Sequence, residues 1–555
     1  MKSLILTTTA IAVFLPACAS AQAAKPLDAV IVTATRLPSS LDWVTGAHVI
    51  DQAELEARQS AFALDVLATV PGVAIARNGA FGGLATIRIR GVGPDKTLVL
   101  VDSVPVGDAA DPNGTFDPSQ VQLSDISRIE VLSGPQGSLW GSEAIGGVVA
   151  FTTKELSGWR LEAEGGSFST ARGYAGAGVS TDAYAVGASA AGFRADGISK
   201  ADGGSEADGF HTVTATAGGR VKLSGVLQLD GRVRYTDSKV DIDGFAPPTF
   251  QLGDTPDVNK SRAWTGFARA TLDGVWGLRQ QLSFSAYDLQ RQNISSFPSR
   301  FDGKRQVWRW TAERAGLVVG AERNATSADL SGRPSLDLST TSAFAVGRHA
   351  MGPLTVTGAL RYDDPDRFKA RGTGRLSAAW EVGSGFTATA SAGQGFKVPT
   401  ISQVICDFCF APIVPLKPER AEGYDLRLGW KSPDDRFSAA LTGYRLNVRD
   451  QIAYVASRYI NIARTRSKGV EAEADVGLTE AFRLKLAYAV TEAVDGSTGL
   501  TLLRVPERSG AASLFWNQDP WNVSATLRAE SSQADTARDG FSRTTRKGFA
   551  VADVA

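Results

Sequence analysis

Acidic side chains that could ligate a metal ion gather in two short, glycine-containing segments. The five carboxylates are Asp202, Glu206 and Asp208 in KADGGSEADGF, and Asp241 and Asp243 in KVDIDGF. Carboxylates spaced by two residues beside glycine can bring several oxygen atoms around a hard cation such as calcium. The spacing is not that of an EF-hand loop, so a set of solvated turn residues is the alternative.

Two cysteines lie three positions apart, Cys406 and Cys409 in VICDFCFAPIV. In an oxidising compartment such a pair is expected to form a disulfide. The spacing could also begin a metal site, but no second pair and no nearby histidine completes one. A redox role has even less support, so we expect a disulfide in an outward loop.

No arrangement of residues predicts catalysis. The sequence has no nucleophile elbow, no supported Ser-His-Asp set and no phosphate-binding loop, and Gly91–Pro94 (GVGP) lacks the strand-to-helix context of a nucleotide site. A total of three histidines also argues against a histidine-rich metal or haem site. We therefore expect a protein that binds or transports rather than an enzyme, with no cofactor except a candidate structural calcium ion.

A β-prone run lies close to the N-terminus, at Asp28–Arg36 (DAVIVTATR). It contains β-branched residues but no turn residues and no obvious strand partner. A free strand of this kind exposes unpaired backbone groups and can be captured by another chain.

The residues before this run predict export. Lys2, an apolar run from Leu4 to Leu15 and the Ala21-Gln22-Ala23 triplet are typical of a signal peptide over residues 1–23. The apolar run is too short to span a bilayer as a helix. Cys18 gives a lipoprotein-processing alternative, which Pro16 fits poorly.

Composition narrows the class of exported protein. Lysine plus arginine equals aspartate plus glutamate at 58 each, so no basic excess argues for nucleic-acid binding. No later stretch approaches 18 consecutive apolar residues. The protein is expected to be periplasmic, secreted or an outer-membrane barrel.

The pattern of apolar and polar residues in the sequence changes near residue 155. Before it, an amphipathic helix over 61–69 and strands over 86–90, 97–101, 129–132 and 147–153 indicate a compact α/β domain. After it, segments of about 8–12 residues alternate apolar and polar side chains, with aromatic residues near their ends, which is typical of a transmembrane β-barrel. A soluble β-sandwich or propeller is the alternative. Residues 156–555 supply about 20 strands, and a barrel of that size requires a plug.

Several motifs carry a family resemblance in the order that the family shows. They are ALDVLATVPGV at 63–73, IRIRG at 87–91, LVLVD at 98–102, RIEVLSGPQGSLWGSEAIGG at 128–147, GFKVPT at 395–400, LKPE at 416–419 and SKGVE at 467–471. Together with DAVIVTATR, these motifs make the chain resemble the TonB-dependent outer-membrane receptors, most closely the receptor for cobalamin (vitamin B-twelve).

The resemblance implies a fold and a domain order. It implies a 22-strand type of transmembrane antiparallel β-barrel with an N-terminal α/β plug domain in its lumen. The expected order is a signal peptide at 1–23, a periplasmic extension with a TonB box at 24–36, a plug at 37–155 and a barrel at 156–555. The protein is then expected to be a monomer in the outer-membrane lipid of a Gram-negative bacterium.

The resemblance also assigns roles to residues. The loose strand becomes the segment that TonB captures by strand pairing, with its inner-membrane energising complex supplying the work; its residues are Asp28, Val30, Ile31, Val32, Thr33 and Ala34. Arg88 and Arg90 are expected on one strand face, paired inside the barrel with Glu130 or with barrel carboxylates, and a solvated strand face is the alternative. The calcium expectation gains support because the cobalamin receptor binds calcium through acidic outer loops.

Three functions follow from these features. The first is active uptake of cobalamin, the second is uptake of a ferric siderophore or another scarce ligand by the same family, and the third is a passive porin or adhesin. A passive pore needs neither a TonB box nor a plug, which argues against the third.

The end of the sequence departs from the family pattern. The chain ends GFAVADVA rather than on an aromatic residue. By comparison with the family we expect that about three strands, or roughly 50–60 residues, are missing from a 22-strand architecture.

Overall fold

The computed structural model describes residues 30–31, 39–201, 204–246, 251–330, 333, 335–406, 409–537 and 542–555. The predicted signal peptide lies outside these residues. In the described part of the chain, no helix combines the length and apolarity that a membrane crossing would need.

The first part of the chain alternates short strands with short helices. Its elements are β1 (Val30–Ile31), β2 (Ser39–Ser40), η1 (Leu41–Trp43), β3 (Ala47–Ile50), α1 (Gln52–Arg58), α2 (Ala63–Leu67), β4 (Val73–Arg77), β5 (Ala85–Ile89), η2 (Pro94–Lys96), β6 (Thr97–Val101), β7 (Val104–Pro105), η3 (Pro118–Gln120), β8 (Ile126–Ser133), α3 (Gly137–Trp140) and β9 (Gly147–Thr153). Five of the strands form one sheet in the order β3-β8-β9-β6-β7, in which only β6 and β9 run parallel.

This five-stranded sheet is buried on both faces, as its nearly continuous apolar runs require. On β6, Val99 and Val101 belong to one core cluster, which includes residues of α1 and α2. Leu98 and Leu100 belong to a second cluster, which continues into barrel side chains such as Phe344. The domain therefore shares its core with the surrounding wall.

Two predicted elements of this domain have different bounds in the structure. The helix expected over 61–69 is shorter and begins only at Ala63, because Phe62 pairs with Gln122 and the amide of Ala63 donates to the Val121 carbonyl. The strand expected over 86–90 ends at Ile89, since Arg90 adopts φ +53.

The remaining strands make one wall. They are β10 (Gly158–Gly166), β11 (Thr170–Ser180), β12 (Tyr184–Ala195), β13 (Phe210–Lys222), β14 (Leu227–Ala246), β15 (Gln251–Val275), β16 (Leu278–Ile294), β17 (Ser299–Arg314), β18 (Leu317–Leu330), β19 (Leu336–Met351), β20 (Leu354–Pro365), β21 (Arg371–Gly383), β22 (Phe386–Lys397), β23 (Glu419–Lys431), β24 (Phe437–Val455), β25 (Arg458–Gly477), β26 (Phe482–Asp495), β27 (Arg508–Gln518), β28 (Trp521–Glu530) and β31 (Phe549–Val554). They form a single 20-stranded antiparallel sheet in chain order. A hairpin of β29 (Gln533–Thr536) and β30 (Arg543–Arg546) and the helix α4 (Ile401–Ile405) interrupt the connections.

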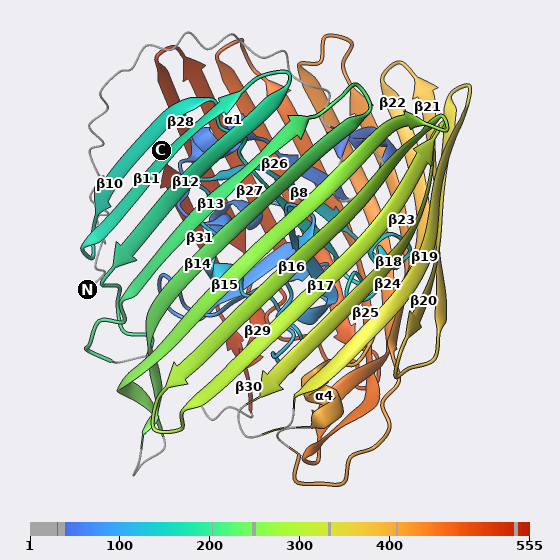
Figure 1. Cartoon of the computed structure of the whole chain (residues 1–555). Coiled ribbons are helices and arrows are strands. Elements are labelled where there is room, and N and C mark those ends of the chain that lie inside the picture. Colours follow the sequence, from blue (N-terminus) through green and yellow to red (C-terminus); the bar gives the residue numbers. More distant parts are fainter. Residues whose placement is uncertain are drawn as a thin grey trace.

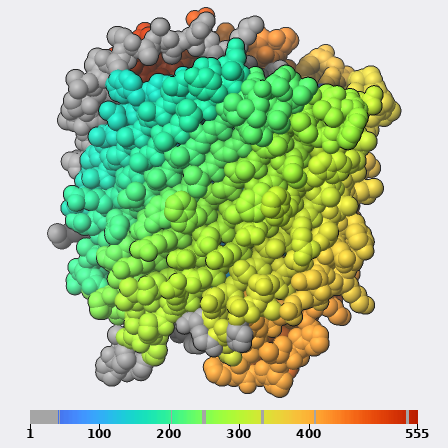
Figure 2. All heavy atoms as spheres, viewed as in Figure 1, coloured from blue at the N-terminus to red at the C-terminus, as the bar shows by residue number. Residues whose placement is uncertain are grey.

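The long strands slant around the first domain, whose elements are visible inside the wall (Figure 1). Figure 2 shows that the wall forms a continuous surface from β10 across to the yellow strands on this face. The structure confirms the predicted fold class, a plug domain inside a large antiparallel barrel. The boundary expected at 155–156 falls between β9 and β10.

Side chains of the wall alternate between the lumen and the outside. On β13, Thr212, Thr214 and Thr216 are buried, whereas Val213 between them is 50% exposed. Polar residues therefore face the lumen and apolar residues face outward, as in a barrel in lipid.

The two ends of the barrel differ. At one end the strands are joined by short turns, with exposed tryptophans such as Trp276, Trp380 and Trp521 beside them. At the other end longer connections carry α4 and the tips of β14 and β15, at the bottom of Figure 1. In barrels of this class short turns face the periplasm and long loops face the exterior.

Candidate functional site

The barrel lumen is filled by the plug, and polar contacts join the two. Ion pairs and side-chain hydrogen bonds link nearly every side of the plug to inward-facing barrel residues. The ion pairs are Glu56–Arg160, Asp102–Arg232, Asp125–Arg234, Asp108–Arg291, Glu143–Arg305, Asp95–Lys397, Lys96–Glu419, Arg90–Asp425, Arg90–Glu471, His48–Glu473, Glu54–Lys485 and Asp65–Arg528. Charged side chains therefore join much of the plug to the wall, and removing one partner of a buried pair would leave the other charge uncompensated.

Arg90 makes the most enclosed of these contacts. Its side chain is 1% exposed, and its Nε and Nη atoms donate to the Glu471 carboxylate at 2.9 and 2.8 Å. A further Nη donates to Asp425, and the guanidinium carbon lies 4.2 Å from the ring centre of Tyr444. Because a lone buried charge is costly, each partner depends on the others.

The backbone of Arg90 aims this side chain at the wall. Ile87 and Ile89 of β5 are buried in the plug, and the chain then turns at Arg90 and Gly91 with φ of +53 and +73. The amide of Arg90 donates to Gly72 at 2.7 Å, and Ser467 of β25 donates to the Arg90 carbonyl at 2.6 Å. The turn thus presents the guanidinium to β23 and β25.

The other predicted plug residues lie elsewhere. Arg88 and Arg90 do not share a strand face, because β5 ends between them. Arg88 is partly buried and lies within the electrostatic influence of Asp95. Glu130 lies on β8, where it forms an ion pair with Arg128 of the same strand at 2.9 Å.

A second cluster lies at the 3-10 helix η2 of the plug. Asp95 lies between two cations, with its carboxylate 2.7 Å from Lys397 of β22 and close to Lys96. Burial disfavours the charged carboxylate, but the two ammonium groups outweigh burial and lower the pKa of Asp95. Burial likewise opposes the charge on Lys96, but Asp95 and Glu419 raise its pKa. Both groups are therefore charged at neutral pH.

Helix α1 forms a third contact, near the short-turn end (Figure 1). Glu54 accepts from Lys485 of β26 at 2.5 Å and from Arg58 at 2.6 Å, and Arg58 also donates to Thr526 of β28 at 2.9 Å. Burial would raise the pKa of Glu54, but the two cations hold it below its usual value.

The predicted coupling strand is only partly described. Val30 and Ile31 pair with Ser40 and Ser39, so this part of the run has a strand partner that sequence reasoning did not find. Asp28, Val32, Thr33 and Ala34 lie outside the described residues.

Acidic residues of one outer loop and of the adjoining strands β14 and β15 do approach one another. Oxygen atoms of Glu206, Asp243 and Asp254 all lie within 4.8 Å of each other. Partial desolvation and the carboxylates of Asp243 and Asp254 raise the pKa of Glu206. Asp254 was missed in the sequence, because it lies in GDTPD on the next strand and only the hairpin of β14 and β15 brings it here.

The other predicted calcium residues are placed differently. Asp241 forms an ion pair with Lys239 at 2.8 Å, and Asp208 accepts from the amide of Lys200 at 2.6 Å. Asp202 lies outside the described residues. Amide donors also occupy part of the cluster, since Asp254 accepts from the amide of Ser205 at 2.8 Å.

The outer end of the plug contacts the end of strand β12 and the connection that carries α4. Phe81 and Phe62 pack against Phe193 of β12 with ring centres 5.0 and 4.9 Å apart. On another side, Thr400 donates to the Pro112 carbonyl at 2.8 Å. Leu84 of the plug is 60% exposed.

Cys406 and Cys409 follow α4 in the same connection as Thr400. The structure joins them by a disulfide with Cα atoms 5.3 Å apart. The disulfide lies directly after α4, the helix whose N-cap residue Thr400 contacts the plug.

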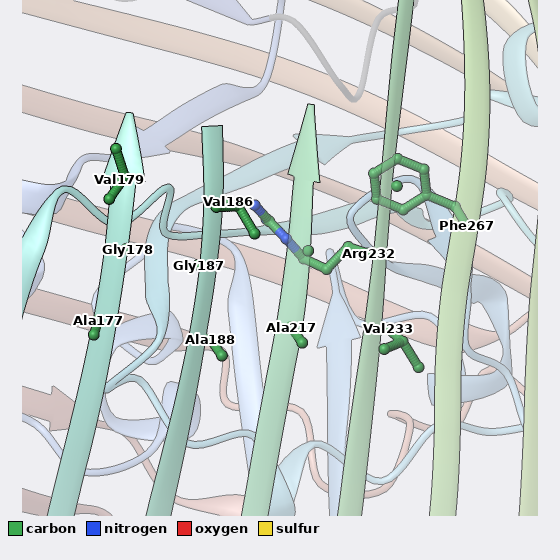
Figure 3. Close-up of a pocket in the computed structure, with 12 residues that line it drawn as sticks. Ala177, Gly178, Val179, Val186, Gly187, Ala188, Ala217, Arg232, Val233 and Phe267 are labelled. Atoms are coloured by element: carbon green, nitrogen blue, oxygen red, sulfur yellow. The ribbon is translucent and has the colours of Figure 1, made fainter. Parts of the chain in front are cut away.

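The outer wall has a shallow groove of its own. Figure 3 shows Ala177, Ala188 and Ala217 on neighbouring strands, with Val186 and Val233 beside them. The lining is almost entirely apolar, which suits lipid chains and not a polar nutrient. We therefore place the functional surface in the lumen and the outer loops.

Comparisons with known proteins agree with this architecture. The family described as "TonB dependent receptor-like, beta-barrel" matches residues 150–555, and the family described as "TonB-dependent Receptor Plug Domain" matches residues 42–148.

Three solved structures illustrate the likeness of fold. The siderophore receptor PirA of Acinetobacter baumannii is 17% identical with a TM-score of 0.77, covering 92% of this chain and 91% of that one. A point mutant of the ferric enterobactin receptor PfeA of Pseudomonas aeruginosa is 16% identical with a TM-score of 0.77, covering 95% and 92%. The pyoverdine-bound FpvA of P. aeruginosa is 14% identical with a TM-score of 0.76, covering 95% and 82%.

Proposed function

The chain belongs to the TonB-dependent receptor family, and from that premise we propose that it carries out active uptake of a ferric siderophore across the outer membrane. The observation that carries the proposal is a folded plug that fills the lumen yet is bound to the wall by ion pairs. A passive pore needs no such domain, whereas energised uptake needs one that can be displaced.

The ligand class is the finer part of the proposal. The three structural neighbours described above are a siderophore receptor, a ferric enterobactin receptor and a receptor with bound pyoverdine, and none of the three is a cobalamin receptor. The likeness to these receptors supports a ferric siderophore as the ligand. The sequence motifs had favoured cobalamin. Ligand selection depends on outer loops and the plug surface, where family motifs give least information.

Equilibrium binding to the purified receptor tests the ligand class. The probes are ferric enterobactin, ferripyoverdine and cyanocobalamin, with the iron-free siderophores as matched controls. We expect saturable binding of a ferric complex, weaker binding of its iron-free form and none of cyanocobalamin. Saturable binding of cyanocobalamin alone would restore the cobalamin interpretation.

Coupling to the inner membrane is proposed to run through the N-terminal strand. TonB would capture Ile31 to Thr35 by adding a strand, which uses backbone groups and therefore tolerates varied side chains. The short pairing of β1 with β2 would have to open first, and two paired residues offer little resistance.

A calcium ion in the outer loops is a further proposal. Glu206, Asp243 and Asp254 would supply oxygen ligands, and the ion would relieve their mutual repulsion. Binding of radioactive calcium to the receptor should fall at least about tenfold in Asp243→Asn. Asp241→Asn, which removes a carboxylate paired with Lys239, should leave calcium binding unchanged; equal calcium binding by all three proteins would exclude the site.

A further inference from the structure

The outward face of β23 changes from apolar to charged toward the long-loop end. Glu419 and Asp425 point inward to the plug, so the alternate residues face outward. Leu428 and Leu426 are 55% and 56% exposed, Tyr424 follows them, and Arg420 lies nearest to the loops. Tyrosine is common where lipid tails meet headgroups, so Arg420 lies at headgroup level.

The wall is split beside this face. β21 and β22 pair only as far as Arg375 and Gly393, whereas beyond that point Arg371 remains paired to β20 and Gln394 to β23. A polar pocket of about 100 Å³ lies at the split. It is lined by Arg371, Gln394, Arg420, Glu422, Asn447 and Arg449, together with small neighbouring residues.

The pocket holds more positive than negative charge. Arg420 lies directly opposite Arg449 on β24, an arrangement that destabilises a sheet when both residues are cations. Arg371 lies close enough to interact electrostatically with both Arg420 and Asp450. Asp450 pairs with Arg420 at 2.7 Å, but in the described part of the chain neither Arg371 nor Arg449 forms an ion pair.

We propose that this pocket binds a phosphate group in the headgroup of an outer-leaflet lipid. Guanidinium groups match phosphate oxygens in geometry and charge, and an anion here would offset the repulsion between Arg420 and Arg449. Leucines below the pocket would contact the acyl chains of the same molecule. That second contact favours a lipid over free phosphate, which gains nothing from an apolar wall.

The proposal is independent of the transported ligand and needs only the outer-membrane location. The test uses the full chain in detergent, with bisphosphorylated lipid A, its dephosphorylated form and inorganic phosphate as probes. We expect the receptor to bind the bisphosphorylated lipid at least about tenfold more tightly than the other two, the effect of one charged hydrogen bond.

Variants locate the binding. Arg420→Gln with Arg449→Gln should abolish most of the preference for the phosphorylated lipid, and the corresponding lysine pair should restore part of it. Arg262→Gln is the matched control, since Arg262 is an exposed arginine paired with Asp237 on the distant strands β14 and β15. Heat-modifiable migration in gels checks that each barrel is folded.

Three results would overturn the proposal. They are equal affinity of the unaltered receptor for phosphorylated and dephosphorylated lipid, an equally tight complex with inorganic phosphate alone, and a glutamine pair that folds and keeps the full preference. The first two need no variant, so a folding failure cannot hide them.

Discussion

Arg90 is the plug residue whose ion pairs with the barrel wall are the most deeply buried of those described. Two carboxylates, Asp425 and Glu471, are buried against it. Replacing Arg90 by glutamine would leave them without their nearest counter-charge, at a cost of about 3–5 kcal/mol. Backbone amides of the adjoining plug segment, such as Val92, should then exchange hydrogen at least about 100-fold faster, as measured by mass spectrometry.

Arg77→Gln is the control for this experiment, because Arg77 is an exposed plug arginine at the end of β4. It should leave the exchange rates unchanged. Unchanged rates in Arg90→Gln as well would mean that packing, not this ion-pair cluster, holds the segment.

Asp117 should make the plug sensitive to pH. Burial raises the pKa of its carboxyl to about 6, although Ser119 and Ala85 donate amide hydrogen bonds to it at 3.0 and 3.1 Å. A raised pKa means that the folded plug holds the proton more tightly than the unfolded chain, so stability falls as pH rises from about 4 to 6.

Hydrogen exchange of β5, whose first amide binds Asp117, should therefore quicken over this range. Asp117→Asn keeps an oxygen acceptor but cannot titrate, so its exchange, corrected for intrinsic rates, should not vary with pH. An identical pH profile in the variant would assign the effect to another group.

At the residue scale, sequence could show which residues are charged but not with whom they pair. The motif IRIRG predicts two plug arginines, Arg88 and Arg90. The turn at Arg90, which the motif does not predict, gives the two side chains different surroundings. Asp254 was not predicted as a metal ligand, because its neighbours in space come from other segments of the chain.

Among the elements, the N-terminal strand gives the sharpest prediction. Val32→Pro would remove a backbone donor and fix φ, so TonB could not add a strand at that point. Uptake of a bound ferric siderophore by cells should collapse while binding at the cell surface stays near normal. Val32→Ile, which preserves strand propensity, is the matched control.

Radiolabelled ligand on intact cells measures both quantities. If Val32→Pro lowered binding and uptake equally, the strand would serve folding rather than coupling.

Elements with strong periodicity were the easiest to predict. In strands such as β13, apolar and polar residues alternate because the two faces of the strand meet different surroundings. This pattern can be recognised from the sequence alone. Element ends in the plug were harder, since the bridge of Phe62 to Gln122 overrides a helical pattern. The five-residue helix α4 was missed within a stretch where only strands and loops were expected.

In the whole molecule, the barrel is too wide for its own side chains to fill the lumen, and the plug domain fills it instead. Both faces of the plug sheet pack on plug helices and on wall residues, while ion pairs surround the domain. The size of the barrel predicted a plug, but which wall strands it contacts depends on pairings that no local pattern contains.

The central claim is that transport through this plugged barrel needs energy delivered by TonB. The direct measurement is accumulation of iron-55 from ferric enterobactin or ferripyoverdine, whichever the receptor binds. Cells should carry this receptor as their sole siderophore receptor and either possess or lack TonB. We predict equal surface binding in both strains, with accumulation above background only where TonB is present; equal accumulation in both strains would contradict the account and make the protein a passive pore.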